Sequence, residues 1–556
     1  MKRLVTGTFR RFFLLLAAGC LASPGISQNL PPLSFVFHDS AASQGYYFLS
    51  PYTNTPPFIY NHAQLILDNL GRVVFYRVFP KSNSPNATID FKLQPEGHIT
   101  YFDINRNKHM IMDSTFTVVD SIECLHGFIT DQHDLRILPN HHYLLFGTEN
   151  RIMNLSSYHY FGINHTTPGA TNAQVMGVVI QEFDENKTLV WEWKGHDHYS
   201  FSDVDPVWLF SPSKVDWTHA NAVEQDGDGN ILISLRHFDE ITKIDHASGN
   251  ILWRFGGKQN QFTFLNDPTR FTGQHDVRRT ASGNLSFFDN GQYTNPAVCR
   301  AVEYSLDENA KTSQLTWEYI YDSNMYSVAC GNHYYIDNGN HLVDFGFVNS
   351  AGLPWMVVVR PDKSEVMEIH YPAGYISYRA FNYLTLPWQL HRPAVTCRRI
   401  GSQYYLEAEE GHPEYQWSTG DTTAMIPIAD TGDYWVFVPY GSGYISSEHV
   451  RITDPLTPCF FAGVPPEPTI QALSVLPNPA SGSMHIAFAL DTGSPVSFAL
   501  VDRMGRERCR RAEERFASGR HEIRMNLAGI EPGLYFLRMN TPFGTTVIKV
   551  AVKSPV

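Results

Sequence analysis

The chain has 556 residues, of which 43% are apolar and 13% aromatic, enough for several domains with large cores. Its formal net charge is −13, and no Lys/Arg cluster occurs beyond the N-terminus, which argues against nucleic acid or an anionic membrane surface as a partner. No later stretch approaches the about 18 consecutive apolar residues that a membrane-spanning helix needs.

The N-terminus carries an export signal. Basic residues, among them Arg10 and Arg11, precede the apolar run of residues 12–18, and small residues follow. This order is typical of a signal peptide, so we expect residues 1–27 to be removed and the chain to be exported in soluble form. The alternative is lipidation of Cys20, because residues 17–20 (AAGC) resemble a lipoprotein box that lacks its usual Leu.

A strand-turn-strand unit recurs over residues 33–392. Each copy is an apolar strand that ends in Asp, a short turn, and a strand that ends in an aromatic or large apolar residue. Its Asp residues lie 52 to 64 residues apart, as Asp120 follows Asp68 and Asp184 follows Asp120. This period predicts a β-propeller, because a closed ring of sheets leaves few exposed strand edges. We expect six blades, with seven as the alternative, and we interpret the Asp residues as turn formers.

Polar residues stand at the start of one strand in several of these units. Residues 216–221 (DWTHAN) and 274–278 (QHDVR) open two such strands, and His133 and residues 330–333 (CGNH) hold the same place in two others. Each strand is expected to be the innermost of its blade, so its first residues would lie at one end of the central channel. We therefore predict that His219 and His275 converge, and that Asn221 shares the face of His219.

Two smaller β modules are expected after the propeller. Residues 395–454 predict an Ig-like β-sandwich, followed by a Pro-rich linker at residues 455–469 and a compact β-sandwich at residues 470–556. The predicted fold class is therefore all-β: a six-bladed β-propeller, an Ig-like β-sandwich and a C-terminal β-sandwich. Cys397 and Cys459 bracket the Ig-like module, which makes them the expected disulfide of an exported protein.

The last module resembles the C-terminal sorting domain of the type IX secretion system. The resemblance rests on residues 476–482 (LPNPASG), residues 532–536 (PGLYF) and the terminal Lys549-Val550. It implies export through the periplasm and outer membrane by the type IX machinery, as a secreted or surface-attached protein. Residues 417–423 (WSTGDTT) are similar to the Ig-like modules that often precede such a domain.

The propeller region resembles the arylsulfotransferase family, of the type that does not use PAPS. The segments that carry the resemblance are residues 216–221, 234–237 (SLRH), 253–257 (WRFGG), 274–278, 288–291 (FDNG) and 300–304 (RAVEY). It implies a six-bladed propeller that moves a sulfuryl group between phenols through a sulfated histidine, with no cofactor. His219, His275 and Arg300 carry over as catalytic residues. The family's third channel histidine does not, because its position falls at Gly331-Asn332.

Sulfuryl transfer needs a nucleophile for sulfur, cationic or N–H contacts for its oxygens, and an acid for the departing phenolate. Two histidines, which titrate near neutrality, and one arginine are chemically sufficient for these roles. We expect no metal site, because residues 226–230 (DGDGN) lack full calcium-loop spacing and predict a turn. The further side chains expected to contact the substrate are those of Asn221, Arg236, Asp276, His133, Asn332 and His333.

The sequence thus predicts an exported enzyme that transfers a sulfuryl group from a phenolic sulfate ester to a phenolic acceptor through a sulfohistidine intermediate. Two alternatives stay open. One is a non-catalytic surface propeller that binds glycans or proteins, which the absent third histidine and the Ig-like module favour. The other is a hydrolase or lyase that acts on sulfated or acidic saccharides with the same histidines.

Overall fold

The computed structural model describes residues 30–39, 43–53, 59–79, 87–162, 164–294, 297–323, 325–348, 352–372, 374–455, 471–490, 494–502, 506–517, 519–541 and 544–553. The expected signal peptide, Cys20 and Cys459 lie outside these residues. The only helices within them are the short 3-10 helices η1 (Gly195–Asp197), η2 (Phe201–Asp203), η3 (Pro206–Trp208) and η4 (Arg236–Phe238). The prediction of an all-β chain is confirmed, and none of the described helices is long and apolar enough to cross a membrane.

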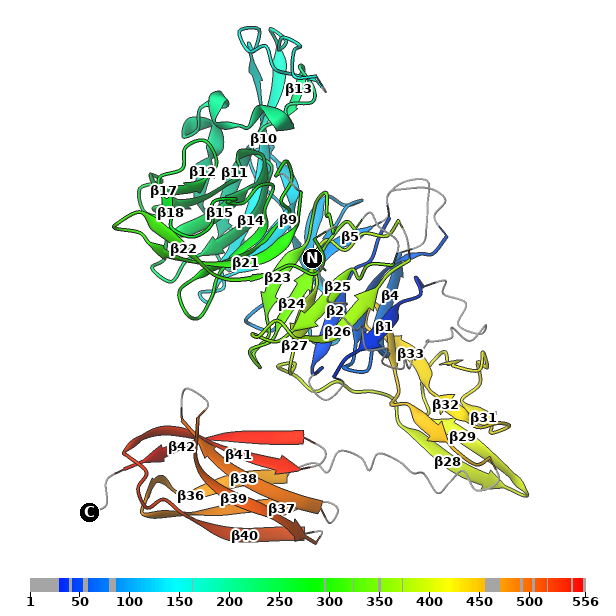
Figure 1. Cartoon of the computed structure of the whole chain (residues 1–556). Coiled ribbons are helices and arrows are strands. Elements are labelled where there is room, and N and C mark those ends of the chain that lie inside the picture. Colours follow the sequence, from blue (N-terminus) through cyan, green and yellow to red (C-terminus); the bar gives the residue numbers. More distant parts are fainter. Residues whose placement is uncertain are drawn as a thin grey trace, which may run out of the picture. The chain divides into compact units, whose positions relative to one another are not determined.

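Six sheets built on the described strands of residues 34–383 contain a run of four neighbouring strands each (Figure 1). The number of blades stays a prediction. In spatial order the runs are β27 (Phe381–Tyr383), β2 (Tyr46–Leu49), β3 (His62–Leu67), β4 (Val73–Phe79); β5 (Thr88–Leu93), β6 (Ile99–Asp103), β7 (Lys108–Met112), β8 (Val118–Ile122); β9 (Ile129–Ile137), β10 (Tyr143–Met153), β11 (Ala173–Phe183), β12 (Leu189–Lys194); β14 (Ala220–Gln225), β15 (Ile231–Leu235), β16 (Glu240–Ile244), β17 (Ile251–Gly256); β19 (His275–Arg279), β20 (Leu285–Asp289), β21 (Arg300–Asp307), β22 (Thr312–Tyr319); and β23 (Asn332–Tyr335), β24 (His341–Asp344), β25 (Met356–Val359), β26 (Glu365–His370). The short strands β1 (Ser34–Phe37), β13 (Lys214–Asp216) and β18 (Thr263–Phe264) add to three of these sheets.

Strands from the two ends of this segment complete each other's sheets. The late strand β27 pairs antiparallel with β2, with Phe381 opposite Phe48. The first strand, β1, pairs with β26, with Val36 opposite Glu368. The chain therefore covers strand edges at both of its ends, as closure of a propeller requires.

The strand-end Asp residues form the turns between strands, as the sequence predicts. Asp68 Oδ1 accepts hydrogen bonds from the backbone N–H groups of Leu70 and Arg72, each at 2.9 Å. Asp184 Oδ1 does the same for two later N–H groups at 2.9 and 2.7 Å. The carboxylate replaces the missing backbone partners of the turn, which is why the same residue type recurs in each unit.

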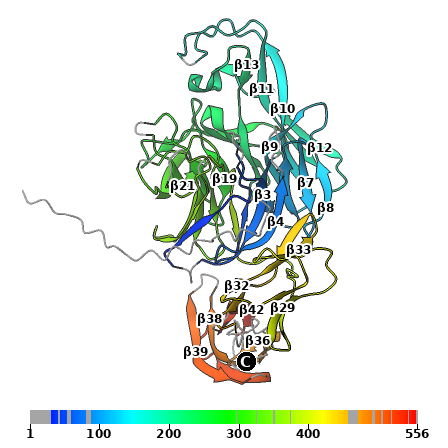
Figure 2. The ribbon, with the colours of Figure 1, turned by 90° about the vertical axis from the view of Figure 1, so that its right-hand side faces the viewer.

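The hairpin of β10 and β11 is longer than the other hairpins of the six sheets. Its strands pair from Tyr143 opposite Phe183 to Met153 opposite Ala173 and rise beyond their own sheet (Figure 2). The chain that follows β12 forms η1 to η3 and returns along the hairpin as β13. Trp208 and Trp217 of this segment are buried in the same apolar cluster as the hairpin, which fixes the polar residues that follow Trp217.

The module after the propeller begins with a series of short strands. The hairpin of β33 and β34 pairs with β4, with Ile445 opposite Phe75, and Trp417 is fully buried with its indole N–H bonded to the Thr423 carbonyl at 2.8 Å. Cys397 is disulfide-bonded, and its expected partner lies outside the described residues. The strands are β28 (Val395–Ile400), β29 (Gln403–Ala408), β30 (Gln416–Trp417), β31 (Met425–Pro427), β32 (Gly432–Tyr434), β33 (Val436–Tyr440), β34 (Gly443–Ser446) and β35 (Val450–Ile452).

The C-terminal module is a separate all-β unit with its own core. Its strands follow the spatial order β39-β38-β41-β42-β36-β37-β40. Alternate residues of these strands are buried, for example Met484, Ile486 and Phe488 of β37, as the period of two predicts. The strands are β36 (Gln471–Ser481), β37 (Ser483–Leu490), β38 (Ser494–Val501), β39 (Glu507–Phe516), β40 (Gly519–Asn526), β41 (Gly533–Thr541) and β42 (Gly544–Val552).

Candidate active site

Three histidines in or beside neighbouring inner strands are brought together. Strand β14 contacts both β9 and β19, which carry His133 and His275, and His219 immediately precedes β14. The rings of His133 and His219 lie 4.9 Å apart between centroids. Burial lowers the pKa of His275 far below its usual range, and the nearby charges of Arg236, His219 and His133 lower it further. The structure thus groups the two histidines of the predicted pair with His133.

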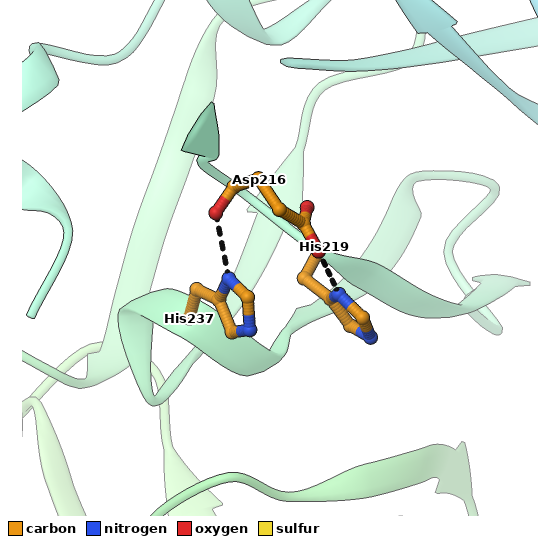
Figure 3. Close-up of side chains that lie close together, drawn as sticks. All are labelled: Asp216, His219 and His237. Carbon is orange, nitrogen blue, oxygen red and sulfur yellow. Dashed lines mark hydrogen bonds and ion pairs between the residues drawn. The ribbon is translucent and has the colours of Figure 1, made fainter. Parts of the chain in front are cut away.

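Two of these histidines are each held by a carboxylate. The Nδ1 atom of His219 lies 2.5 Å from Asp216 Oδ2 (Figure 3), and the Nδ1 atom of His133 lies 2.5 Å from Asp131 Oδ1. Burial raises the pKa of both aspartates, but the adjacent histidines outweigh it and keep each pKa below its usual range. An ionised carboxylate at Nδ1 places the proton on that nitrogen, so the lone pair of the neutral ring is on Nε2.

Another buried histidine, His109, contacts the backbone of one dyad. His109 is 1% exposed, and its Nε2–H donates to the Asp131 carbonyl at 3.0 Å. Burial and the charge of Lys92 lower its pKa to about 4, whereas an unfolded histidine has a pKa of about 6.5. The stabilisation from neutral His109 is therefore complete above about pH 6.5 and is lost as the pH falls toward about 4.

We expect the free energy of unfolding to fall by about 3 kcal/mol between pH 6.5 and 4 because of His109, since each pKa unit corresponds to about 1.4 kcal/mol. Substitution of His109 by Gln, which retains an N–H donor, should reduce the proton uptake on unfolding by about one over that range. Urea unfolding of both proteins at several pH values measures it. An identical pH dependence in the two proteins would contradict the assignment.

His237 completes the group but has no free ring nitrogen. Its Nδ1–H donates to the Asp216 carbonyl at 2.8 Å, and its Nε2 lies 3.0 Å from Arg236 Nη1, a donor. Burial, with the charge of His219 next, lowers its pKa far below the usual range, so the ring is neutral. Ligand atoms of Asp216, His219 and His237 lie within 4.8 Å of one another, but a metal at His237 Nε2 would have to displace the guanidinium. These contacts fit an anion better than a cation.

Arg236 is a partly buried cation whose hydrogen-bond partners among the described residues are all neutral. Nη2 donates to Gln292 Oε1 at 2.8 Å and to the Val328 carbonyl at 3.0 Å, the guanidinium lies 4.3 Å over the Trp208 ring, and Nε has no acceptor. Burial lowers its pKa below the usual range. The charges of Asp216 and Asp239 act against this lowering, but no carboxylate among the described residues forms an ion pair with the guanidinium, so this side chain is suited to bind an anion.

A cavity of about 310 Å³ lies beside the two dyads. Asp131, His133, Asp216 and His219 are among the residues that line it. The remaining lining residues are mainly apolar, and they include Phe102, Ile104, Ile129, Phe146, Met176 and Val178. The volume suits a small molecule, and the mixture of aromatic walls with a few polar groups is common in ligand sites.

His275 and its neighbour strand explain why a third channel histidine is missing. Nδ1 of His275 lies 2.7 Å from Asn290 Oδ1, and the Cys330 backbone N–H donates to its Nε2 at 3.2 Å. Gly331 has φ +95°, and a Cβ there would lie 2.6 Å from the Asp344 carbonyl oxygen and 2.7 Å from the Phe288 ring. A histidine therefore does not fit at position 331, and a backbone amide occupies the lone pair of His275 instead.

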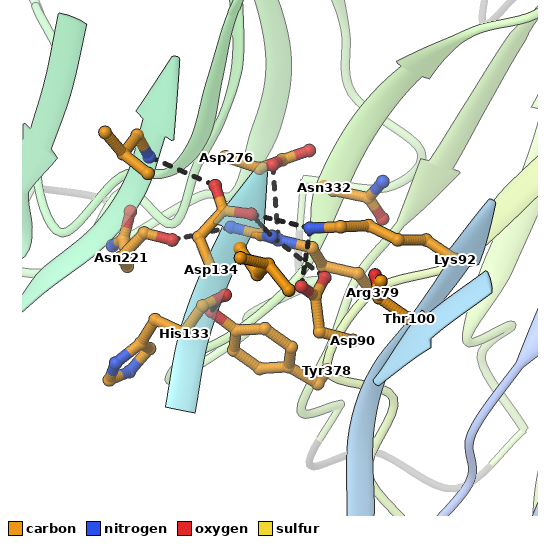
Figure 4. Close-up of polar contacts among 12 residues, drawn as sticks. Asp90, Lys92, Thr100, His133, Asp134, Asn221, Asp276, Asn332, Tyr378 and Arg379 are labelled. Carbon is orange, nitrogen blue, oxygen red and sulfur yellow. Dashed lines mark hydrogen bonds and ion pairs between the residues drawn. The ribbon is translucent and has the colours of Figure 1, made fainter. Parts of the chain in front are cut away.

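Near His133 lies a buried network of six charged residues, of which Figure 4 labels Asp90, Lys92, Asp134, Asp276 and Arg379. Lys92 Nζ lies 2.6 Å from carboxylates of both Asp90 and Asp134, and Arg278 Nη2 contacts Asp134 at 2.8 Å and Asp276 at 2.6 Å. Arg379 contacts all three carboxylates, at 3.0 to 3.3 Å. Three cations thus balance three anions, and we interpret Asp276 as part of this support.

The other predicted site residues have structural contacts. Asn221 joins the network, because its carbonyl accepts a hydrogen bond from Arg379 Nη2 at 2.5 Å, and the Asn332 amide makes two hydrogen bonds to the Ala380 backbone. His333 faces away from this group and pairs with His341, Nε2 to Nδ1, at 2.8 Å, as the alternation of a regular strand predicts.

Arg300 is used in ion pairs of its own. Its guanidinium contacts carboxylates of Asp289 at 2.9 Å, Asp267 at 2.7 Å and Glu318 at 3.2 Å. The Asp289 charge is the main cause, against burial, of a pKa above its usual range. With three carboxylates around it, Arg300 is less suited than Arg236 to bind an anionic substrate.

The sequence motifs did not mark Asp131, Asp216 or His237 as site residues. They did not mark the network residues Asp90, Lys92, Asp134, Arg278 and Arg379 either. A signal was present for Asp131 and Asp216, because a carboxylate precedes His133 by two residues and His219 by three. His237 follows Arg236 within a quoted motif, but nothing in its spacing marks it as a neighbour of His219. Arg379 lies outside every motif.

Comparison with family models identifies the propeller region. The model described as Arylsulfotransferase (ASST) matches residues 38–379, more than half of the 556. The chain belongs to the arylsulfotransferase family. No curated protein matches this family member.

Solved structures show only remote likeness to this arylsulfotransferase-family chain. A protein of unknown function from Bacteroides caccae aligns with a TM-score of 0.38 at 11% identity, over 61% of this chain and 98% of that one. A catalytically inactive virginiamycin B lyase from Staphylococcus aureus with quinupristin gives 0.32 at 9%, over 68% and 96%. PorZ, a surface component of the type-IX secretion system of Porphyromonas gingivalis, gives 0.25 at 10%, over 88% and 73%.

The C-terminal module of this arylsulfotransferase-family chain is a sorting domain. The model for the secretion system C-terminal sorting domain matches residues 474–553, which covers the seven-stranded module almost entirely. This confirms the resemblance seen in the sequence. The chain is therefore a substrate of the type IX secretion machinery, exported for secretion or attachment to the cell surface.

Proposed function

We propose that the chain transfers a sulfuryl group from a phenolic sulfate ester to a phenolic acceptor, with His219 as the nucleophile. The observation that carries the proposal is the pair of Asp–His dyads that line the cavity, with the guanidinium of Arg236 on His237, whose ring stacks on His219. The family supplies the aryl sulfate as the substrate class. No nucleotide cofactor takes part, because the donor ester itself carries the sulfuryl group.

In the first half of the reaction, His219 attacks sulfur. Nε2 forms a bond to sulfur while the bond from sulfur to the aryl oxygen breaks, and its electron pair leaves with the phenolate. His133, protonated on Nε2, donates that proton to the departing oxygen. Asp216 lies 2.5 Å from His219 Nδ1 and stabilises the positive ring that results.

The second half reverses these roles with a different phenol. The acceptor hydroxyl gives its proton to His133 Nε2, and its oxygen attacks the sulfur of sulfo-His219. The N–S bond breaks and its electrons return to the histidine, which restores the starting state. The ring separation of 4.9 Å between His133 and His219 supports this exchange, because both histidines line the same cavity and can act on one bound substrate.

The cavity wall supports an aryl substrate. Phe102 and Phe146 line the cavity together with its polar groups, and Met176 and Val178 add apolar surface. A phenyl ring packed there loses water on both faces and directs its oxygen toward the histidines. The donor and the acceptor bind against the same apolar residues one after the other, so a single cavity serves both substrates.

Arg236 is expected to hold the sulfuryl oxygens, so its loss should affect transfer more than stability. Substitution by Gln should lower kcat/KM for the donor by about 10²- to 10³-fold, the usual effect of removing one oxyanion donor. Substitution by Lys should recover only part of it, because the planar fork is lost. Steady-state kinetics with a series of donor concentrations measures both. An unchanged kcat/KM in the Gln variant would exclude this role.

The proposed function is tested by trapping the intermediate. The full chain is mixed with 4-nitrophenyl sulfate without acceptor, quenched in alkali, and digested for mass spectrometry. We expect one sulfo group on the peptide that contains His219, which disappears when phenol is then added and phenyl sulfate forms.

Other outcomes of the same experiment separate the alternatives. Release of nitrophenol and inorganic sulfate without dependence on phenol would favour the hydrolase. Neither an adduct nor product, with donor binding still detectable, would favour a non-catalytic binding propeller. Either result would overturn the sulfotransferase proposal.

A further inference from the structure

A second group of ligand-type side chains lies far from the dyads in sequence, where the first strand meets the last sheet. His38 follows β1, and Glu365 and Glu368 lie on β26, its antiparallel neighbour. His38 Nε2 lies 3.0 Å from Glu368 Oε1 and 3.6 Å from Glu365 Oε2. Ligand atoms of the three residues all lie within 4.8 Å of one another.

A β-bulge brings the two glutamates together. Glu365 and Glu368 are three residues apart, so a regular strand would place them on opposite faces. The register between β25 and β26 shifts at this point, because Val358 faces Met367 while Val359 faces Glu365. The extra residue, Val366, changes the phase of the strand. Its carbonyl also accepts the backbone N–H of His38 at 2.9 Å, which fixes the histidine over the same place.

The glutamates are oriented by side chains from the neighbouring sheet and strand. Tyr319 of β22 donates its hydroxyl to Glu365 Oε1 at 3.0 Å. His370 Nε2 lies 3.0 Å from Glu368 Oε2, the oxygen that does not face His38. Each carboxylate is therefore held through one oxygen and has the other near His38, and the Glu368 oxygen near His38 also accepts the Tyr321 hydroxyl at 3.4 Å. Partners of this kind commonly orient the ligands of a metal ion.

The charge of this group is not compensated by a lysine or arginine. Among the described residues, the only ion-pair partners of Glu365 and Glu368 are His38 and His370. Paired carboxylates elsewhere in the chain hold a lysine between them. Lys243, for example, lies 2.8 Å from both Asp226 and Asp228. Between Glu365 and Glu368, no lysine or arginine of the described residues takes the corresponding position.

We propose that His38, Glu365 and Glu368 bind a zinc ion that ties β1 to β26. Two zinc bonds of about 2.0–2.1 Å at a tetrahedral angle separate their ligand atoms by about 3.3 Å, and the observed separations of 3.0 and 3.6 Å bracket this value. One imidazole and two carboxylates with an open fourth position suit zinc better than calcium, which prefers six or more oxygens. The role is structural, because the ion would join the first strand to the sheet that it completes.

The proposal is tested by zinc binding to the full chain after removal of metal with a chelator. Isothermal titration should give a zinc equivalent whose affinity falls at least about tenfold in His38→Ala and in Glu365→Gln. Both side chains are about one-third exposed, so both variants should fold. Zinc should also raise the unfolding temperature of the wild type but not of these variants.

Two further variants separate this site from other binding. His485→Ala removes an exposed histidine that contacts one glutamate, Glu522, at 2.9 Å, and should bind zinc like the wild type. His219→Asn should also keep this zinc equivalent, since it changes only the candidate active site. The proposal is overturned if zinc does not bind, if His38→Ala and Glu365→Gln bind it unchanged, or if His219→Asn alone abolishes binding.

Discussion

Substitution of His219 by Asn is expected to lower kcat for sulfuryl transfer by about 10⁴-fold or more, the usual consequence of removing a nucleophile. Asn retains a polar group of similar size near Asp216 but offers no nitrogen lone pair to sulfur. The sulfo adduct should disappear with the activity, while the affinity for the donor changes little, because the wall at Phe102 and Phe146 is intact. Steady-state kinetics, donor binding by calorimetry and adduct mass together measure the effect.

A matched control is available outside the cavity. His126 also forms a dyad, with Nδ1 2.8 Å from Glu192 Oε2, but it is exposed and does not line the cavity. His126→Asn should therefore keep full activity. If His219→Asn still forms the adduct and His133→Asn does not, the nucleophile is His133. If both variants keep full activity, the cavity is not the site of transfer.

The convergence of the histidines was predictable because it depends on repetition. Equal positions in equal units reach equal depth, so His219 and His275 could be paired from spacing alone. Asp134 and Asp276, which immediately follow His133 and His275, carry the same signal for the buried network. The repetition of these two aspartates is visible in the sequence, but their shared partner is not. The cation between them, Arg379, comes from a different part of the chain.

The choice between two arginines was not predictable from the sequence. Arg236 and Arg300 both lie in segments that resemble the family. What distinguishes them is the set of direct partners: Asp267, more than thirty residues before Arg300, pairs with it at 2.7 Å, while Arg236 has only neutral hydrogen-bond partners. Such contacts depend on how distant loops pack, and no local spacing encodes them. Gly331 is similar, since the clash that excludes a histidine there comes from Phe288 and Asp344.

Substitution of Arg379 by Met is expected to lower the free energy of unfolding by about 3–5 kcal/mol, as the loss of one member of a buried charge network does. The guanidinium is 1% exposed and contacts Asp90, Asp134 and Asp276, which lie on three inner strands. Met fills a similar volume, so the loss is mainly electrostatic: Lys92 and Arg278 remain to balance three carboxylates. Urea unfolding, followed by tryptophan fluorescence, measures the change.

The double variant Asp90→Asn/Arg379→Met distinguishes charge from packing. It removes one anion together with the cation, so it should recover part of the stability that Arg379→Met loses. Arg106→Met is the surface control: Arg106 is 60% exposed and lies 3.7 Å from Asp103, so its loss should change stability by less than about 1 kcal/mol. If the double variant is no more stable than the single one, packing around Arg379 matters more than its charge. If Arg379→Met is as stable as Arg106→Met, the charge network does not hold the inner strands together. The contact that this segment would then still make with β9 is the hydrogen bond from the hydroxyl of Tyr378, the residue before Arg379, to the His133 carbonyl at 3.1 Å.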